Sequence, residues 1–510
     1  MNKKLRRTVA KHNRKMSKRL ERSHCRANPD EHPVFTAGKN VHYEISDRIQ
    51  ATPYGGIPVM LGLVNQLGLP KLLNREFEGL ICYHRPYMES DHVLNIALCH
   101  LTGGRQPEDL KQLRHSLPYL DSLGAERIPD ATTAGDFCRR FESQKGHHLA
   151  LMEIFNTVRE TVWQAQPAAF RQQAVLDVDG TLCETQGEKK EGIALSRTGR
   201  WGYMLQAITL ANTGEPLYLI NNPGNCVSHH GIAPWIDRAL ELAGRNFERV
   251  LLRGDTDFSL TENFDRWDQR SDFVFGYDVM ANLRAYIATE LDDQKHWQEL
   301  QRKSRYHVKT KPRRKRRNYK EEYIRFKEYK NYKLAGEELA EFDYRPYKCK
   351  KTYRMIVLRK TLQVTQGQLE FLPETRLFIY ITNRRDVAAE QIVEEANQRC
   401  NQENLFAQFK SGSGAFKMPL DSLGANWAYC LCATLAQSIK VWFALHSKNK
   451  ALKERLLKME LPTFIKRMIE WPAQILHHAR RIVTRFLDCG PDLLDLLKIN
   501  QDLRSVRIRT

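Results

Sequence analysis

Apolar residues recur at helical spacing in the first third of the chain, and the pattern then changes. In this part apolar side chains return every three or four positions in three stretches: Ile57–Leu67, Val93–Leu101 and Leu149–Trp163. Glycine and proline residues between the stretches predict turns. We therefore predict a helical domain over residues 27–170, preceded by a basic arm over residues 1–26.

Short apolar runs replace the helical pattern from about residue 171. Four of them predict strands: Ala174–Asp179, Met204–Ala211, Leu217–Ile220 and Arg249–Arg253. Asn212-Thr213-Gly214 predicts a hairpin turn between the second and third strands, and a helix around Leu240 precedes the fourth. The order strand, hairpin of two strands, helix, strand is that of an RNase H-like core.

The remaining chain divides into an insertion, the rest of the core and a tail. Residues 277–374 are rich in Lys, Arg and Tyr, and we interpret them as an inserted β-rich basic domain. Arg376–Thr382 predicts a buried strand, and Asp386 can cap a long helix running to about Lys410. The predicted fold class is α/β, with an RNase H-like catalytic core over residues 171–276 and 375–425 and a helical C-terminal region over residues 426–510.

The charge of the chain is concentrated in two stretches. The 80 Lys and Arg against 60 Asp and Glu give a formal net charge of +20. Met1–Arg26 has 11 basic residues and one acid, and Arg302–Arg317 has 10 basic residues and no acid. Such runs attract nucleic acid because each neutralised phosphate releases a condensed counterion, whereas a solvated tail is the alternative for the first stretch. The predicted DNA contacts in the second stretch are Arg313, Arg314, Lys315, Arg316 and Arg317.

Composition excludes several other classes of protein. With 42% hydrophobic residues the chain can form a packed core, and its 11 cysteines contain no CxxC pair, which favours a reduced intracellular protein. The basic start contains no apolar segment typical of a secretory signal. The most apolar run, Trp427–Leu445, is interrupted by Gln437 and Lys440, so we predict a packed helix, a cytoplasmic location and no membrane role.

Three acidic positions are the candidates for chemistry. Asp177 and Asp179 point the same way along a strand, about 6.6 Å apart, and Asp179, which precedes a glycine, is better placed at the strand exit. Asp255 follows the fourth strand, and Glu403 shares a predicted helix face with Arg399 and Lys410. Three convergent carboxylates would hold two Mg²⁺ ions, which is the arrangement for phosphodiester chemistry.

These motifs resemble bacterial insertion-sequence transposases of the DDE type, in the group whose third acid lies in a Tyr-x2-Arg-x3-Glu-x6-Lys signature. Arg399-x3-Glu403-x6-Lys410 matches this signature, with Ala396 at the tyrosine position. Arg253-Gly-Asp255-Thr-Asp-Phe258 is similar to an Arg-x-Asp-Ser-Gly-Phe pattern of the group, so Asp257 stands at a glycine position. The resemblance extends over about residues 171–442 and includes the β-rich insertion.

The resemblance implies a cut-and-paste transposase. Such an enzyme binds the terminal inverted repeats of its own element, works as a homodimer on paired ends of double-stranded DNA, and transfers 3′-OH ends into target DNA. Asp179, Asp255 and Glu403 would be its catalytic and metal-binding acids, with Mg²⁺ or a substituting Mn²⁺. Arg399 and Lys410 would contact phosphates near the cleaved bond, and the expected location is the bacterial nucleoid.

Two alternatives remain open at this point. Asp177-x-Asp179-Gly-Thr181 also matches the nucleophile motif of haloacid-dehalogenase-like phosphatases, in which Asp177 would be the nucleophile and Asp179 the general acid. The predicted hairpin after the first strand does not fit that fold. The other alternative is a non-catalytic DNA-binding descendant of a transposase, against which the intact acids argue.

Overall fold

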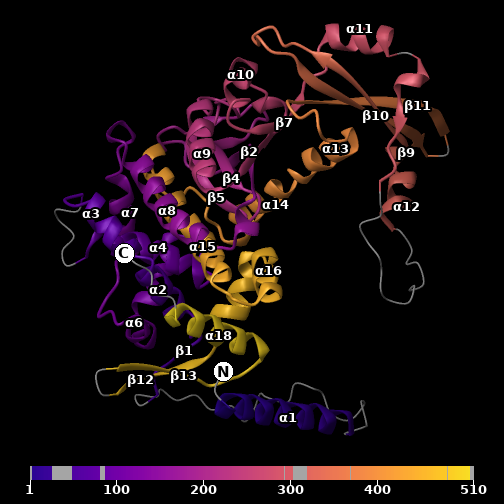
Figure 1. The fold of residues 1–510 in the computed structure, drawn as a ribbon. Helices are drawn as coiled ribbons and strands as arrows, with labels where there is room; N and C mark the ends of the chain where they lie inside the picture. The colour runs from indigo at the N-terminus through magenta and orange to yellow at the C-terminus, as the bar shows by residue number, and fades with distance from the viewer. Residues whose placement is uncertain are drawn as a thin grey trace.

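The computed structural model describes residues 3–25, 49–80, 87–291, 293–302, 319–367, 369–478 and 481–505. Within these residues one sheet of ten strands passes through the molecule, and helices form most of the rest (Figure 1). The strand order is β3-β4-β2-β6-β7-β11-β10-β9-β8, and β5 pairs with β4. The bounds are β2 Gln173–Glu184, β3 Ala194–Leu195, β4 Trp201–Leu210, β5 Glu215–Pro223, β6 Arg249–Gly254, β7 Asp272–Tyr277, β8 Gln298–Glu299, β9 Lys330–Tyr344, β10 Tyr353–Gln366 and β11 Leu369–Thr382.

The four strands predicted after residue 171 are confirmed, as is the helix before the fourth. β2 lies between β4, to which it is antiparallel, and β6, to which it is parallel. The hairpin turn between β4 and β5 contains Gly214 at φ +71°, a backbone conformation that glycine adopts without strain. Helix α9, Ala233–Asn246, returns the chain to β6 and buries Ile236 and Leu240, which fits their helical spacing.

A buried helix forms the centre of the helical part of the molecule. Helix α15, Leu423–Leu445, is buried at every position from Ala425 to Leu445 and packs against α4, α7, α8 and β5. The predicted packed helix in this region is therefore confirmed. Among the described helices, α15 is long and apolar enough to cross a membrane, but its most apolar window lies wholly inside the protein.

The helices before and after the large sheet share one hydrophobic core, which extends from Ile57 to Leu503. Those before it are α2 Ile57–Gln66, α3 Leu69–Glu76, α4 Glu89–Leu101, α5 Leu110–Arg114, α6 Leu117–Leu123, α7 Ala131–Arg139 and α8 His147–Gln164. Those after it are α15, α16 Lys450–Lys458, α17 Leu461–Phe464 and α18 Pro491–Ser505. The predicted regions 27–170 and 426–510 are thus packed together.

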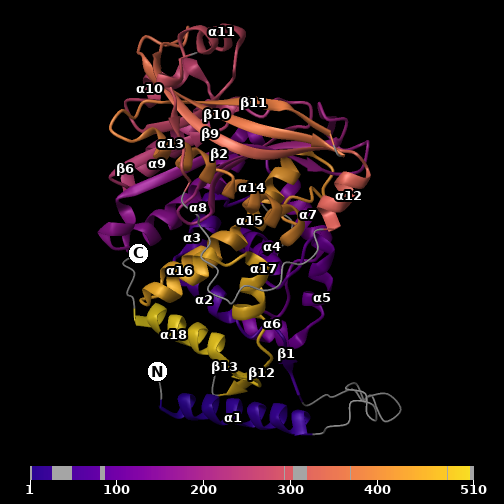
Figure 2. The same ribbon diagram turned by 90° about the vertical axis from the view of Figure 1, so that its right-hand side faces the viewer.

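A second, small sheet also joins the two ends of the chain. Strand β1, Ala51–Thr52, pairs with β12, Ala473–His478, which pairs in turn with β13, Arg481–Phe486. From the sequence we expected a purely helical C-terminal region. The hairpin of β12 and β13 shows that this expectation is wrong for residues 473–478 and 481–486. Helix α1, Lys3–Cys25, lies beside the hairpin at the opposite end of the molecule from the insertion, as both views show (Figures 1 and 2).

The insertion continues the main sheet instead of forming a separate one. β11 pairs with β7 of the core through Ile379–Thr382, and its remaining length pairs with β10. Helices α11, Ala281–Glu290, and α12, Tyr319–Phe326, flank these strands. The predicted DNA-contacting residues Arg313, Arg314, Lys315, Arg316 and Arg317 lie outside the described residues.

The predicted long helix from Asp386 to Lys410 is wrong. Three helical segments replace it: α13 Ala389–Gln398, α14 Asn401–Ala407 and a π-helix over Gln408–Gly412. At the junction the N–H of Arg399 donates to the carbonyl of Ala396, three residues back, at 3.3 Å. This break changes the phase of the helix, so the residues buried after it are Gln402, Leu405, Phe406 and Phe409.

Candidate active site

Asp179 and Asp255 lie at matching positions on two adjacent parallel strands. The last pair in the register of β2 and β6 is Val178 with Gly254, so each acid comes one residue later. Neighbouring strands lie about 4.8 Å apart, which brings the two carboxylates to one place. From the sequence we expected Asp179 at the end of its strand. This expectation is wrong, because β2 continues beyond Asp179 and pairs with β4 as far as Glu184. Instead, it is β6 that ends beside Asp179.

A glycine allows the chain to turn at the second acid. A Cβ on Gly254 would lie 2.9 Å from Phe258 and from Phe275, closer than side chains pack. The chain therefore passes tightly from β6 into a short 3₁₀ turn, Thr256–Phe258. Asp255 caps this turn by accepting a hydrogen bond from the N–H of Asp257 at 3.0 Å. Strand register and turn geometry together fix the place of Asp255.

The environment raises the pKa of both carboxyl groups. The pKa of Asp179 is raised to about 6, mainly by burial and further by the negative charge of Asp255. The positive charge of Arg399 acts in the opposite direction and lowers this pKa. Burial likewise raises the pKa of Asp255, with Arg399 lowering it and the nearby charge of Asp257 raising it. A partly buried carboxylate whose ionisation is also disfavoured by a neighbouring carboxylate is stabilised by a cation placed beside both.

Arg399 supplies a cation from the junction of α13 and α14. Its Nη1 donates to Oδ2 of Asp179 at 2.8 Å, and both side chains are mostly buried. Its charge also acts on Asp255. The sequence pattern predicted that Arg399 binds DNA phosphate, whereas in the protein alone it is the counter-ion of the acid pair.

Lys410 reaches the same strand from the π-helix. Its Nζ donates to the hydroxyl of Thr181 at 2.6 Å, two residues beyond Asp179 on β2, and its side chain remains exposed. Residues that alternate along a strand face the same side, so Thr181 and Asp179 are on one face. Arg399 and Lys410 therefore both lie at this face of β2.

Glu403 does not join the other two acids. It is exposed on α14, and no hydrogen bond or ion pair connects it to Asp179 or Asp255 among the described residues. Its neighbour Gln402 points inward instead and donates to the carbonyls of Asp177 and Ala207 at 3.3 and 3.2 Å. In the described part of the chain no three His, Cys, Asp or Glu side chains form a group able to hold a metal ion.

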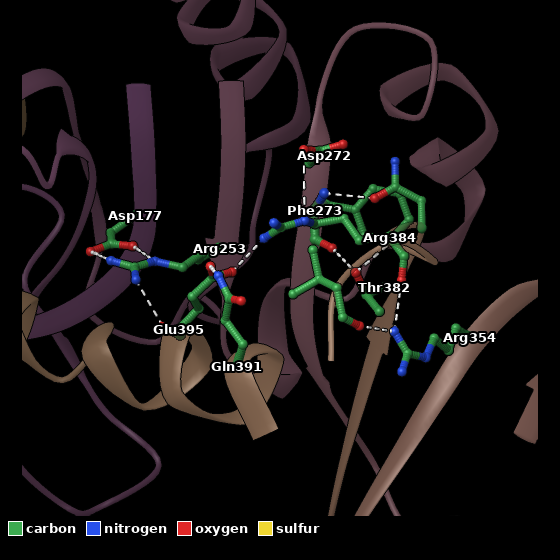
Figure 3. Close-up of polar contacts among 11 residues, drawn as sticks. Asp177, Arg253, Asp272, Phe273, Arg354, Thr382, Arg384, Gln391 and Glu395 are labelled. Atoms are coloured by element: carbon green, nitrogen blue, oxygen red, sulfur yellow. Dashed lines mark hydrogen bonds and ion pairs between the residues drawn. The ribbon is translucent and has the colours of Figure 1, made fainter. Parts of the chain in front are cut away.

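Arg253 belongs to the site, although we predicted no role for it from the sequence. Its guanidinium holds both oxygens of Asp177, at 2.7 and 2.9 Å, and donates to the carbonyl of Glu395 at 2.8 Å (Figure 3). A signal was present in the sequence: Asp177-x-Asp179 on one strand is matched by Arg253-x-Asp255 on the next. Two parallel strands in register place such a pair beside each other.

Comparison with known proteins identifies the family. The sequence model of the family described as transposase DDE domain group 1 matches residues 50–508. The chain therefore belongs to this family, and it is an enzyme of the DDE transposase class, a polynucleotidyl transferase and endonuclease. The resemblance to DDE transposases is confirmed. Helix α1 lies before the matched residues.

Among the solved structures that match, one is similar over most of the length of both chains. It is a piggyBac transposase in a synaptic complex with hairpin DNA, solved by cryo-electron microscopy, with 9% sequence identity and a TM-score of 0.37. The match covers 82% of this chain and 81% of that chain. No curated protein sequence matches.

Proposed function

We propose that this transposase binds the terminal inverted repeats of its own insertion sequence, cleaves the DNA at those ends and joins the 3′-OH ends to target DNA. The observation that supports this most directly is the meeting of Asp179 and Asp255 on adjacent parallel strands of a chain that belongs to a DDE transposase family. The order β5-β4-β2-β6, with α9 before β6, fits an RNase H-like core.

The acid pair fits a divalent metal ion, and we propose Mg²⁺, for which Mn²⁺ can substitute. Carboxylate oxygens are hard ligands, and the charge of Asp255 raises the pKa of Asp179, which a bound cation relieves. Asp179 and Asp255 would hold the metal, and Glu403, four residues after Arg399, would be the third acid when α14 turns toward them. The metal would supply an activated water or 3′-hydroxyl and stabilise the leaving oxygen.

The basic side chains beside the acids would position the DNA strand. Arg399 and Lys410 both donate to residues on one face of β2, and guanidinium and ammonium groups form strong charge-assisted bonds with phosphate. We propose that they contact phosphates next to the cleaved bond. A net charge of +20 would attract the rest of the duplex, which includes element ends and target.

The assembly proposed for the reaction is a homodimer on two paired element ends, located in the cytoplasm on the nucleoid. Two paired ends have to be cut and joined at one target site. A single subunit has one acid pair, so we propose that a second subunit acts on the second end. Sedimentation of the protein with and without end DNA tests this assembly. If the paired ends bring the subunits together, the dimer should form only when the DNA is present.

A cleavage assay tests the proposed function. We expect purified protein with Mg²⁺ to cut plasmid DNA that carries the inverted repeats flanking the coding region. Asp179→Ala, Asp255→Ala and Glu403→Ala should each lower kcat by at least about 10²-fold, because each removes a group that acts on developing charge. Glu241→Ala, an exposed acid on α9, is the matched control and should cut normally.

The same assay separates the alternatives. A non-catalytic descendant would bind the ends and cut nothing, and wild-type cutting by any of the three variants would remove that acid from the assignment. The phosphatase alternative needs Asp177 as a free nucleophile, but Asp177 is 2% exposed and Arg253 holds both its oxygens. Asp177→Asn should therefore impair cutting less than Asp179→Asn, and the reverse order would favour the phosphatase motif.

A further inference from the structure

Arg253 and Asp177 form a buried pair directly before the two acids. They are register partners on β6 and β2, and each lies two residues before an acid, so the pair and the acids share one face of the sheet. Asp177 is 2% exposed and Arg253 is 4% exposed. Two parallel hydrogen bonds from one guanidinium fix the two strands relative to each other more precisely than one bond can.

Arg253 also contacts the helix that carries Arg399. Its Nη1 donates to the carbonyl of Glu395, which lies in the last turn of α13. The regular partner of this carbonyl would be the N–H of Arg399, four residues later, but that N–H donates to Ala396 instead. Arg253 thus satisfies a carbonyl that the helix break leaves without its regular partner, and a cation is favourable at a helix C-terminus.

Further contacts lead from Glu395 into the insertion. Its carboxylate pairs with Arg384, whose backbone carbonyl accepts a hydrogen bond from Arg354 on β10 at 3.2 Å. Thr382, at the end of β11, accepts from the N–H of Arg384 at 3.1 Å. Figure 3 shows the contacts running without interruption from Asp177 to Arg354.

We propose that Arg253 is a positioning residue for the cleavage reaction. It joins β2, β6 and the end of α13, and in this way it holds the break at which Arg399 turns to Asp179 and from which α14 carries Glu403. Arg253 touches neither DNA nor metal in this role. The inference rests on the proposed function, because it explains how the catalytic groups of that function are held.

A purely structural role is the alternative, since removing one partner of any buried ion pair destabilises a protein. The chain offers a matched pair for comparison. Arg159 on α8 and Glu215 on β5 are also buried, 3.0 Å apart, and Arg159 further contacts Ser438 on α15. Among the described contacts, this second pair touches none of the three candidate catalytic acids, Asp179, Asp255 and Glu403. Arg159→Met therefore measures the cost of breaking a buried pair without disturbing α13.

Kinetics on element-end DNA give the first test. Arg253→Met should lower kcat by about 10- to 100-fold, in line with the cost of misplacing reacting groups, while KM for the DNA changes little. Arg159→Met should keep its kcat wherever it is folded. Arg253→Lys retains the positive charge beside Asp177 and should therefore fold more readily than Arg253→Met. A single ammonium cannot bond both Asp177 and the carbonyl of Glu395, so the kcat of Arg253→Lys should also fall. Normal kcat in Arg253→Lys would overturn the proposal.

A double-mutant cycle shows whether Arg253 acts through Arg399. Because Arg399→Ala removes one of the two groups that Arg253 positions, and leaves only Glu403, adding Arg253→Met to it should lower kcat by less than Arg253→Met does alone. The corresponding cycle with Arg159→Met should be additive. Additive decreases in both cycles would overturn the proposal.

Hydrogen exchange gives a readout that needs no activity. Arg253→Met removes the side-chain donor that holds the partly buried carbonyl of Glu395, so amides of residues 396–402 should exchange faster than in the wild type and in Arg159→Met. Unchanged exchange there would overturn the inference even if the enzyme cleaves DNA. If the wild type cuts no element-end DNA, the proposed function fails, and the exchange result still decides whether Arg253 holds α13.

Discussion

Arg399 reaches Asp179 across 2.8 Å from the break between two helices, so the acid pair carries its own cation when the protein is alone. Under the proposed function, a divalent metal ion that binds Asp179 and Asp255 would have to displace this guanidinium. Arg399 would then be available to bond a phosphate, as the family signature implies.

The first prediction concerns the pH dependence of metal binding. Burial raises the pKa of Asp179 to about 6 and Arg399 lowers it, so the carboxylate gains its charge, and its metal affinity, as the pH rises through about 6. Arg399→Gln removes the positive charge that lowers the pKa of Asp179. We therefore expect the midpoint of Mn²⁺ affinity against pH, measured by calorimetry, to move to higher pH in this variant. Arg245→Gln, on the surface of α9, is the control, and a midpoint that stays or falls would contradict the assignment.

The second prediction concerns Lys410. If its ammonium holds a phosphate beside Thr181, Lys410→Ala should weaken strand transfer more than end binding, since positioning matters most where charge develops. Gel-shift titrations give the binding and joining assays give the transfer. Lys417→Ala removes an exposed cation a few residues away and should change neither. Equal small effects of both substitutions would make Lys410 an ordinary surface lysine.

The central strands could be predicted because their side chains specify them locally. Ala174, Leu176 and Val178 are apolar and buried, and Gly214 marks the turn between β4 and β5. The insertion was harder to interpret. A change in composition at about residue 277 looks like a domain boundary, yet whether β11 pairs with β7 depends on contacts between residues about 100 positions apart.

The site could be predicted only in part for the same reason. Asp179 and Asp255 follow from strand register, which a sequence pattern indicates. The break after Gln398 does not, because no proline or glycine marks it and the local sequence favours a helix. Arg253 and Asp179 bind that segment from two neighbouring strands, and such tertiary contacts cannot be deduced from the local sequence, nor can the exposure of Glu403 beyond the break.

The last prediction concerns the two basic stretches. Helix α1 exposes the cations Arg7, Lys11, Arg14, Lys15 and Lys18, while Val9 is buried and His12 pairs with Asp488 at 3.0 Å. One face of the helix is therefore docked and the other is basic. Deleting Met1–Arg26, or neutralising Arg313–Arg317, should flatten the plot of log affinity against log salt by about 0.9 for each phosphate that the variant no longer neutralises.

Sequence preference should survive both changes, because phosphate contacts carry no base information and side chains at base edges do. We expect those side chains in the helical region between Ile57 and Gln166. Salt titrations of wild type and both variants, on element-end and on random duplex, distinguish the possibilities. An unchanged slope means that the stretches are solvated, and weaker binding confined to element ends means that they read sequence. Equally weakened binding on both duplexes is the result that general phosphate binding requires.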